Sequence, residues 1–134
     1  NPYTNTISIY SNDPSIVLHE AGHAKDFGRY EYKGSHAVLY GIPFVSLYYE
    51  ANATSDTLSY LEEERKLEAQ KDAYEILYPA YSTYVPGNYA RIDPTSPLLL
   101  PFTILGVAVG HIAGQIASSN VDTNSVPKKK NMDE

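Results

Sequence analysis

The sequence predicts a mainly α-helical chain with a small β element, followed by a C-terminal apolar helix. Long stretches carry helix-type patterning bounded by residues that start and stop helices. Residues 98–117 hold no charged side chain over a length that can span a bilayer core. The length of 134 residues suits one globular domain. We expect that domain over 1–92, a linker over 93–97, a transmembrane helix over 98–117 and a polar tail over 118–134.

Composition limits the partners and the kind of metal site. A net charge of −6 and an isoelectric point near 5.1 argue against a nucleic-acid-binding surface. The chain has no cysteine, so it can form neither a disulfide nor a thiolate metal site. Any metal must therefore be held by histidine and carboxylate side chains.

The first elements predicted are a strand and a helix. Residues 6–10 alternate polar and apolar side chains, which is the pattern of a strand. Asp13 then suits a helix N-cap, and Pro14 suits the first helical position. We expect the helix to run from Pro14 to Phe27 or Gly28, because glycine commonly ends a helix.

This helix contains an H-E-x-x-H pentapeptide from His19 to His23. On a helix the two imidazoles lie four residues apart on one face, where both can bind one Zn²⁺ ion. Glu20, one step round the helix, can reach a water that the metal polarises. Gly22 costs the helix about 1 kcal/mol relative to alanine, which indicates either the close approach of another backbone or a merely tolerated glycine.

A loop and a second helix follow. Residues 29–35 are polar and are predicted to form a loop. From Pro43 we expect a second helix that contains Glu50 and can run on to Tyr78, where Pro79 would end it. Residues 81–91 are predicted to form a loop.

A catalytic zinc needs a third protein ligand beside the two histidines. One class of zinc peptidases continues H-E-x-x-H with a glycine and a histidine at positions that Asp26 and Arg29 occupy here, so that class is excluded. The other common solution is a glutamate from a following helix. Glu50, 27 residues beyond His23, fits that role best.

The strand, the H-E-x-x-H helix and the second helix with Glu50 together resemble a gluzincin metallopeptidase of the minimal or membrane-associated form, over roughly residues 5–60. The segment Glu50-Ala51-Asn52-Ala53-Thr54 partly resembles the E-x-x-A-D pattern around the third ligand of such proteins. The resemblance implies a zincin-like core that binds Zn²⁺ through His19, His23 and Glu50. It also implies peptide-bond hydrolysis with a metal-activated water, with Glu20 as general base and then proton donor to the leaving amine.

Further roles follow from the same resemblance. The family's aspartate supports a ligating histidine, and here its position holds Thr54, with Asp56 as the nearest acid and Asp26 one turn beyond His23 as another candidate. The strand over 6–10 would pair with an extended substrate. A histidine or tyrosine usually stabilises the oxyanion, and the candidates are Tyr74, Tyr78, Tyr81 and Tyr84.

The apolar segment predicts a single pass through a membrane. Gly106, Gly110 and Gly114 are four residues apart and form a stripe of small residues, as in membrane helix packing and in contacts with partners of a membrane complex. Lysines at 128–130 predict a cytoplasmic C-terminus and an extracytoplasmic metal-binding domain. Pro101, His111 and Gln115 favour the alternative, a helix buried in a soluble core or a partner interface, so a soluble form stays open.

Two functions are therefore expected. The first is a membrane-anchored zinc metallopeptidase that acts on peptide or protein substrates. The alternative is a non-catalytic, zincin-like subunit of a membrane protein complex, either metal-binding or degenerate. The two share the zinc site and differ in catalysis.

Overall fold

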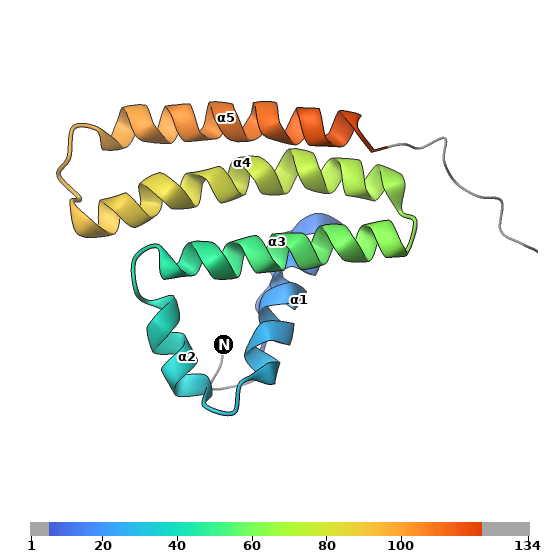
Figure 1. Ribbon diagram of the computed structural model, residues 1–134, viewed down its shortest axis with the longest axis horizontal. Coiled ribbons are helices and arrows are strands. Elements are labelled where there is room, and N and C mark those ends of the chain that lie inside the picture. The colour runs from blue at the N-terminus through green and yellow to red at the C-terminus, as the bar shows by residue number, and fades with distance from the viewer. Residues whose placement is uncertain (1–5, 122–134) are drawn as a thin grey trace, which may run out of the picture.

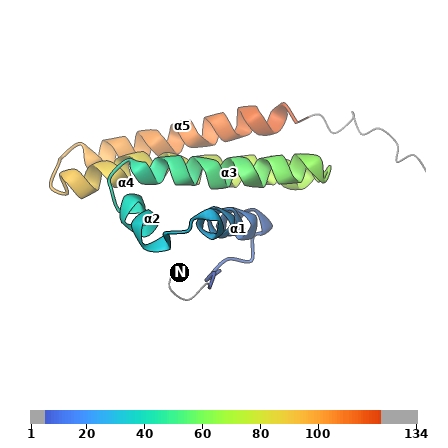
Figure 2. The same ribbon diagram turned by 60° about the horizontal axis from the view of Figure 1, so that its bottom comes forward.

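The computed structural model describes residues 6–121, in which five α-helices account for all the regular structure (Figure 1). Three long helices lie side by side in one layer, antiparallel in succession, with α4 in the middle (Figure 1). α1 crosses α3 steeply, and α1 and α2 lie on the side of α3 that faces away from α5 (Figure 2). The helices are α1 Pro14–Arg29, α2 Lys33–Tyr40, α3 Val45–Glu63, α4 Leu67–Ile92 and α5 Leu99–Ser119.

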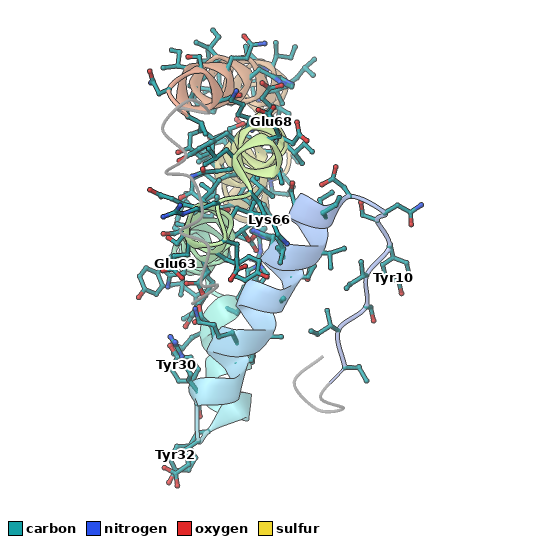
Figure 3. The ribbon with its side chains drawn as sticks, turned by 90° about the vertical axis from the view of Figure 1, so that its right-hand side faces the viewer. Tyr10, Tyr30, Tyr32, Glu63, Lys66 and Glu68 are labelled. Atoms are coloured by element: carbon teal, nitrogen blue, oxygen red, sulfur yellow. The ribbon has the colours of Figure 1, made fainter. Side chains whose placement is uncertain are left out.

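The predicted β element is wrong, and with it the α+β class. Residues 6–10 are extended but form no strand, and the described residues 6–121 contain no sheet. A strand needs a neighbouring strand for its backbone hydrogen bonds, and every other described element is helical. Ile7 and Ile9 are 47% and 42% exposed, and Tyr10 projects away from the helices (Figure 3). The predicted pairing of a substrate with this strand is therefore unsupported.

The first predicted helix is confirmed. The Asp13 side chain accepts a hydrogen bond of 2.8 Å from the backbone N–H of Ser15, and Pro14 occupies the first helical position. The helix continues one residue past Gly28, to Arg29. α2 then begins at Lys33, inside the segment predicted as a loop.

The predicted stop at Pro79 is also wrong. α4 continues through Pro79 and Pro86 to Ile92, so the predicted loop over 81–91 is helical. Both prolines are buried, and packing between α3 and α5 holds the helix together where its own hydrogen bonds are missing. The single helix predicted up to Tyr78 is instead interrupted at residues 64–66, between α3 and α4. In this turn Arg65 has a positive φ of 54°.

Two sets of contacts fix α3 on α4. Leu58, Leu61, Ala73 and Leu77 form a small buried cluster between the two helices. At the other end, the buried Asn88 side chain accepts hydrogen bonds from the Phe44 backbone N–H at 2.7 Å and from the Ser46 hydroxyl at 3.1 Å. Asn88 therefore anchors the start of α3, where Phe44 has a positive φ of 66°.

The glycine stripe of α5 packs against α4. A Cβ atom at Gly106 would lie 3.0 Å from the Ser82 carbonyl oxygen, and one at Gly114 would lie 2.6 Å from that of Tyr74. The Ser82 carbonyl is the one that Pro86, lacking an N–H, cannot satisfy within the helix. Within this chain the stripe therefore serves an internal interface. Its predicted contact with other proteins stays a prediction.

α5 is long and apolar enough to cross a membrane, by length and composition. Only 11% of its most apolar window is buried inside the chain, unlike the core helix of a soluble protein. His111 lies on the exposed side. The turn at 93–98 coincides with the predicted linker, and the predicted tail over 118–134 lies mostly outside the described residues.

A groove of about 980 Å³ runs over α4 between α3 and α5. Its lining combines apolar side chains with hydroxyl groups, and Glu62 is the one charged residue among the lining residues described. Thr54 contributes to one wall, from the same helix that carries Glu50.

Candidate metal centre

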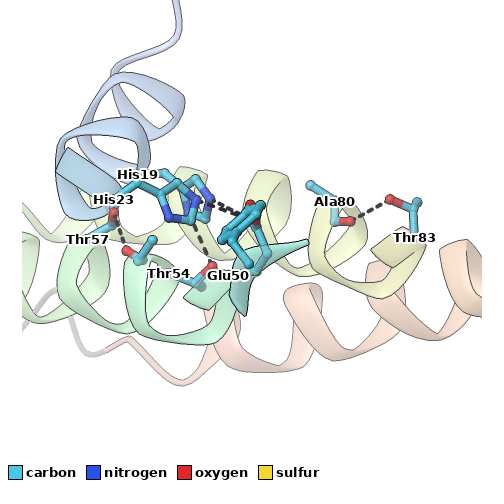
Figure 4. A network of polar contacts seen from close by, with 9 residues as sticks. His19, His23, Glu50, Thr54, Thr57, Ala80 and Thr83 are labelled. Atoms are coloured by element: carbon cyan, nitrogen blue, oxygen red, sulfur yellow. Dashed lines mark hydrogen bonds and ion pairs between the residues drawn. The ribbon is translucent and has the colours of Figure 1, made fainter. Parts of the chain in front are cut away.

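The three predicted ligands, His19, His23 and Glu50, lie together. The two histidines project from α1 towards α3, where Glu50 Oε2 lies 3.0 Å from His19 Nε2 and 3.3 Å from His23 Nε2 (Figure 4). One ligand atom from each of the three residues falls within 4.8 Å of the others. The crossing of α1 over α3 thus closes a separation of 27 residues between His23 and Glu50.

Gly22 permits this crossing. A Cβ atom on Gly22 would lie 3.0 Å from Ala53 Cα and 3.2 Å from the Ala53 carbonyl oxygen. The close approach of another backbone, one of the two explanations for a glycine inside the motif, is confirmed. Because Gly22 lies between the two histidines and Ala53 lies one turn past Glu50, this contact sets the distance between the ligands.

Glu50 is buried and negatively charged. The residue as a whole is only 1% exposed. Burial raises the pKa of the Glu50 carboxyl, but hydrogen bonds from His19, His23 and Tyr40 and the charge of His23 outweigh that effect and hold it well below its usual range. Burial lowers the pKa of His23, and the hydrogen bond to Glu50 with the charges of Glu50, Glu20 and Asp26 raises it overall.

Tyr40 is a site residue that the sequence did not indicate. The last residue of α2, it donates a hydrogen bond from its hydroxyl to Glu50 Oε1. Its ring stacks on Tyr49, with centroids 5.5 Å apart, and meets the edge of the His23 ring at 6.2 Å. With 13 tyrosines in the chain, no feature of the sequence separates Tyr40 from the others.

The three candidates for supporting the ligands have different positions. Thr54 Oγ1 lies 3.3 Å from His19 Nδ1, so Thr54 contacts a predicted ligand (Figure 4). Asp26 lies 3.8 Å from the Arg29 guanidinium and acts on His23 through its charge. Asp56 pairs with Lys25 at 2.5 Å instead.

Among the four tyrosines considered for the oxyanion, Tyr84 lies at this centre. The charges of Glu50 and Glu20 both act on its phenol. The other three, Tyr74, Tyr78 and Tyr81, line the groove over α4. Glu20 is partly buried, and its carboxylate forms no ion pair or side-chain hydrogen bond within the described part of the chain.

The donor set is of a kind that can hold a metal ion such as zinc. In a tetrahedral site with bonds of about 2.0–2.1 Å, neighbouring ligand atoms lie about 3.3 Å apart. The two distances from Glu50 Oε2 to the imidazole nitrogens, 3.0 and 3.3 Å, are close to that value. Two neutral imidazoles with one carboxylate also form a ligand set found in zinc peptidases. His19, His23 and Glu50 can therefore hold a metal ion.

Comparisons with protein-family models, with curated proteins and with solved structures found no match to this chain.

Proposed function

We propose that this protein is a zinc-dependent peptidase. One observation supports the proposal: two histidines of α1 and a glutamate of α3 bring their ligand atoms within 4.8 Å of one another, and the Glu20 carboxylate of the same motif is unpaired among the described residues. The acid next to His19 in the motif is therefore available as a base, while Glu50 from another helix contacts both imidazoles.

The residues have separate roles in this proposal. His19, His23 and Glu50 would hold zinc, which when bound would supply Lewis-acid polarisation of water and of a scissile carbonyl. Glu20 accepts a proton from the attacking water and delivers it to the leaving amine. Tyr84 is 38% exposed, so its hydroxyl could donate a hydrogen bond to the developing oxyanion.

Cleavage of unfolded casein by the purified full chain tests the proposal. Glu20→Gln keeps the size of the side chain and removes the base, so we expect zinc binding to persist while activity falls at least a hundredfold. Glu63→Gln makes the same change on the exposed end of α3 and should leave activity unchanged. Equal cleavage by Glu20→Gln and the wild type would refute the peptidase proposal. Zinc retained by Glu50→Ala would remove Glu50 from the ligand set.

A second candidate is the zincin-like subunit of a membrane complex, and the position of α3, separated from the apolar helix only by α4, favours it. α5 packs along α4, with Gly110 on Pro79, and Leu58 of α3 packs with Leu77 of α4. By this register, the Lys25–Asp56 ion pair lies level with the middle of α5. A charged pair exposed to hydrocarbon costs several kcal/mol. If α5 crosses a membrane, other proteins or water must therefore cover the α1–α3 face.

The membrane part of the proposal refines the predicted single pass. We propose that α5 inserts with its C-terminus in the cytoplasm, as the lysines at 128–130 favour. Because α4 runs beside α5, residues 76–90 of α4, which carry no charge, would enter the membrane with it. The metal centre would then lie beside the membrane-spanning helices. In this proposal that position takes the place of the predicted metal-binding domain wholly outside the membrane.

The absence of cysteine allows a direct test of this arrangement. Single cysteines introduced as Ile112→Cys and Lys25→Cys are labelled with a membrane-impermeant maleimide in native membranes. We expect protection of position 112 and labelling of position 25 only after the assembly is dissociated in detergent. Rapid labelling of position 112 in intact membranes would contradict insertion. Rapid labelling of position 25 would contradict a covering partner.

A further inference from the structure

We propose that Tyr40 is a positioning residue that makes Glu50 a one-oxygen ligand and so keeps a coordination position open. This inference rests on the zinc site proposed above and extends it to a residue outside the metal motif. Tyr40 belongs to α2, which contributes none of the predicted ligands.

The two oxygens of Glu50 have separate partners. Oε2 faces both imidazoles, 3.0 Å from His19 Nε2 and 3.3 Å from His23 Nε2. Oε1 accepts the hydroxyl hydrogen bond of Tyr40. Only one oxygen of the carboxylate therefore points to where the ligand atoms converge, and the other is held by a donor on another helix.

The Tyr40 ring is held by contacts that do not involve its hydroxyl. It stacks on Tyr49 at 5.5 Å with an interplanar angle of 26°, and Tyr49 is itself only 7% exposed. An edge contact with the His23 ring, at a centroid distance of 6.2 Å, restrains the Tyr40 ring from a second side. The hydroxyl is therefore placed by aromatic packing, which is what a positioning group requires.

The consequence concerns the number of ligand atoms. A carboxylate can bind a metal through one oxygen or through both. With Oε1 held by Tyr40, the chain offers three ligand atoms, and a tetrahedral zinc keeps one position for water or a substrate carbonyl. Without the Tyr40 hydroxyl, Oε1 loses the hydrogen bond that holds it away from the other ligands and can turn towards the metal position.

Cobalt substitution of the full chain tests the inference without relying on activity, because four-coordinate Co²⁺ absorbs visible light more strongly than five-coordinate Co²⁺. Tyr40→Phe removes only the hydroxyl and keeps the ring that packs on Tyr49. Tyr48→Phe, at a neighbouring ring that is 63% exposed, is the matched control. Circular dichroism checks that all three chains have the same helix content.

We expect the wild type and Tyr48→Phe to show the strong four-coordinate spectrum and Tyr40→Phe to show the weaker five-coordinate one. Zinc affinity of Tyr40→Phe, from competition with a chromophoric chelator, should fall about ten- to a hundredfold. A Tyr40→Phe spectrum like that of the wild type, or a wild type that is already five-coordinate, would overturn the inference.

The same experiment separates this inference from the proposed function. If the wild type binds neither Co²⁺ nor Zn²⁺, both are wrong. If the spectra differ as expected while Glu20→Gln cleaves casein as well as the wild type, the role of Tyr40 stands and the peptidase proposal fails. If Glu20→Gln is inactive and the spectra are identical, only the role of Tyr40 is refuted.

Discussion

Replacing Gly22 with alanine should weaken zinc binding by forcing α1 away from α3. The new Cβ atom would lie 3.0 Å from Ala53 Cα, 3.2 Å from the Ala53 carbonyl oxygen and 3.3 Å from Ala53 Cβ. These atoms belong to the body of α3 and cannot rotate away. Since carbon atoms pack at about 3.5–4.0 Å, α1 must withdraw by about 0.5 Å or more at this point.

The effect on stability is the balance of two terms. Alanine in place of glycine inside a helix gains about 1 kcal/mol, while overpacking of this kind costs about 1–3 kcal/mol. A Cβ atom at Gly28, on the same helix, would meet no atom within 4 Å, so Gly28→Ala should show the gain alone. The free energy of unfolding of Gly22→Ala should therefore lie about 1–3 kcal/mol below that of Gly28→Ala.

Zinc binding should be more sensitive to this change than the free energy of unfolding. Metal–ligand distances tolerate about 0.2 Å, so a withdrawal of about 0.5 Å misplaces both histidines relative to Glu50. Urea denaturation followed by circular dichroism measures stability, and chelator competition measures zinc affinity. We expect weaker zinc binding in Gly22→Ala and unchanged binding in Gly28→Ala. Equal stability and equal zinc affinity in the two variants would refute the view that Gly22 sets the ligand distances.

Three other predictions test the centre and the fold. Zinc at a hundred times its Kd should add about 2.7 kcal/mol to the free energy of unfolding, measured by urea denaturation, and a similar gain in His23→Ala would argue against the site. In Gly110→Ala the new Cβ atom would lie 2.7 Å from Pro79 Cα, so this variant should be destabilised by about 1–3 kcal/mol. A Cβ atom at Gly87 would meet no atom within 4 Å, so Gly87→Ala should show no such loss. Equal melting temperatures of the two variants would contradict close packing of α5 on α4. Asn88→Ala leaves the Phe44 N–H and the buried Ser46 hydroxyl without their acceptor and should cost about 1–3 kcal/mol. A smaller loss in thermal unfolding would show that water replaces the amide.

Local patterns predicted the parts of the fold that local chemistry determines. The Asp13 cap and Pro14 fix the start of α1 through bonds within one turn of helix, so the sequence indicates them directly. The i,i+4 spacing of His19 and His23 likewise places both imidazoles on one face without help from the rest of the chain. Glu50 was predicted from a pattern seen in related sites, and α3 brings it to the two histidines.

The failures share one cause, which is that tertiary contacts decide them. Proline ends an isolated helix, yet α4 passes through Pro79 and Pro86 because α3 and α5 enclose it on two sides. The alternation in residues 6–10 is a strand pattern, but a strand forms only where another strand can pair with it, and none lies in the described part of the chain.

The same reasoning explains why the outer contacts of the candidate site were harder to foresee than the ligands. Thr54 was considered because it stands in a motif, and it does reach His19 Nδ1. Tyr40 stands in no motif, and its contact with Glu50 depends on how α2 is placed against α3 and on the packing of its ring on Tyr49. A zinc site needs its ligands in one place, but its open position depends on such contacts. Thus the residue whose replacement says most about coordination at this centre is one that only the three-dimensional structure identifies.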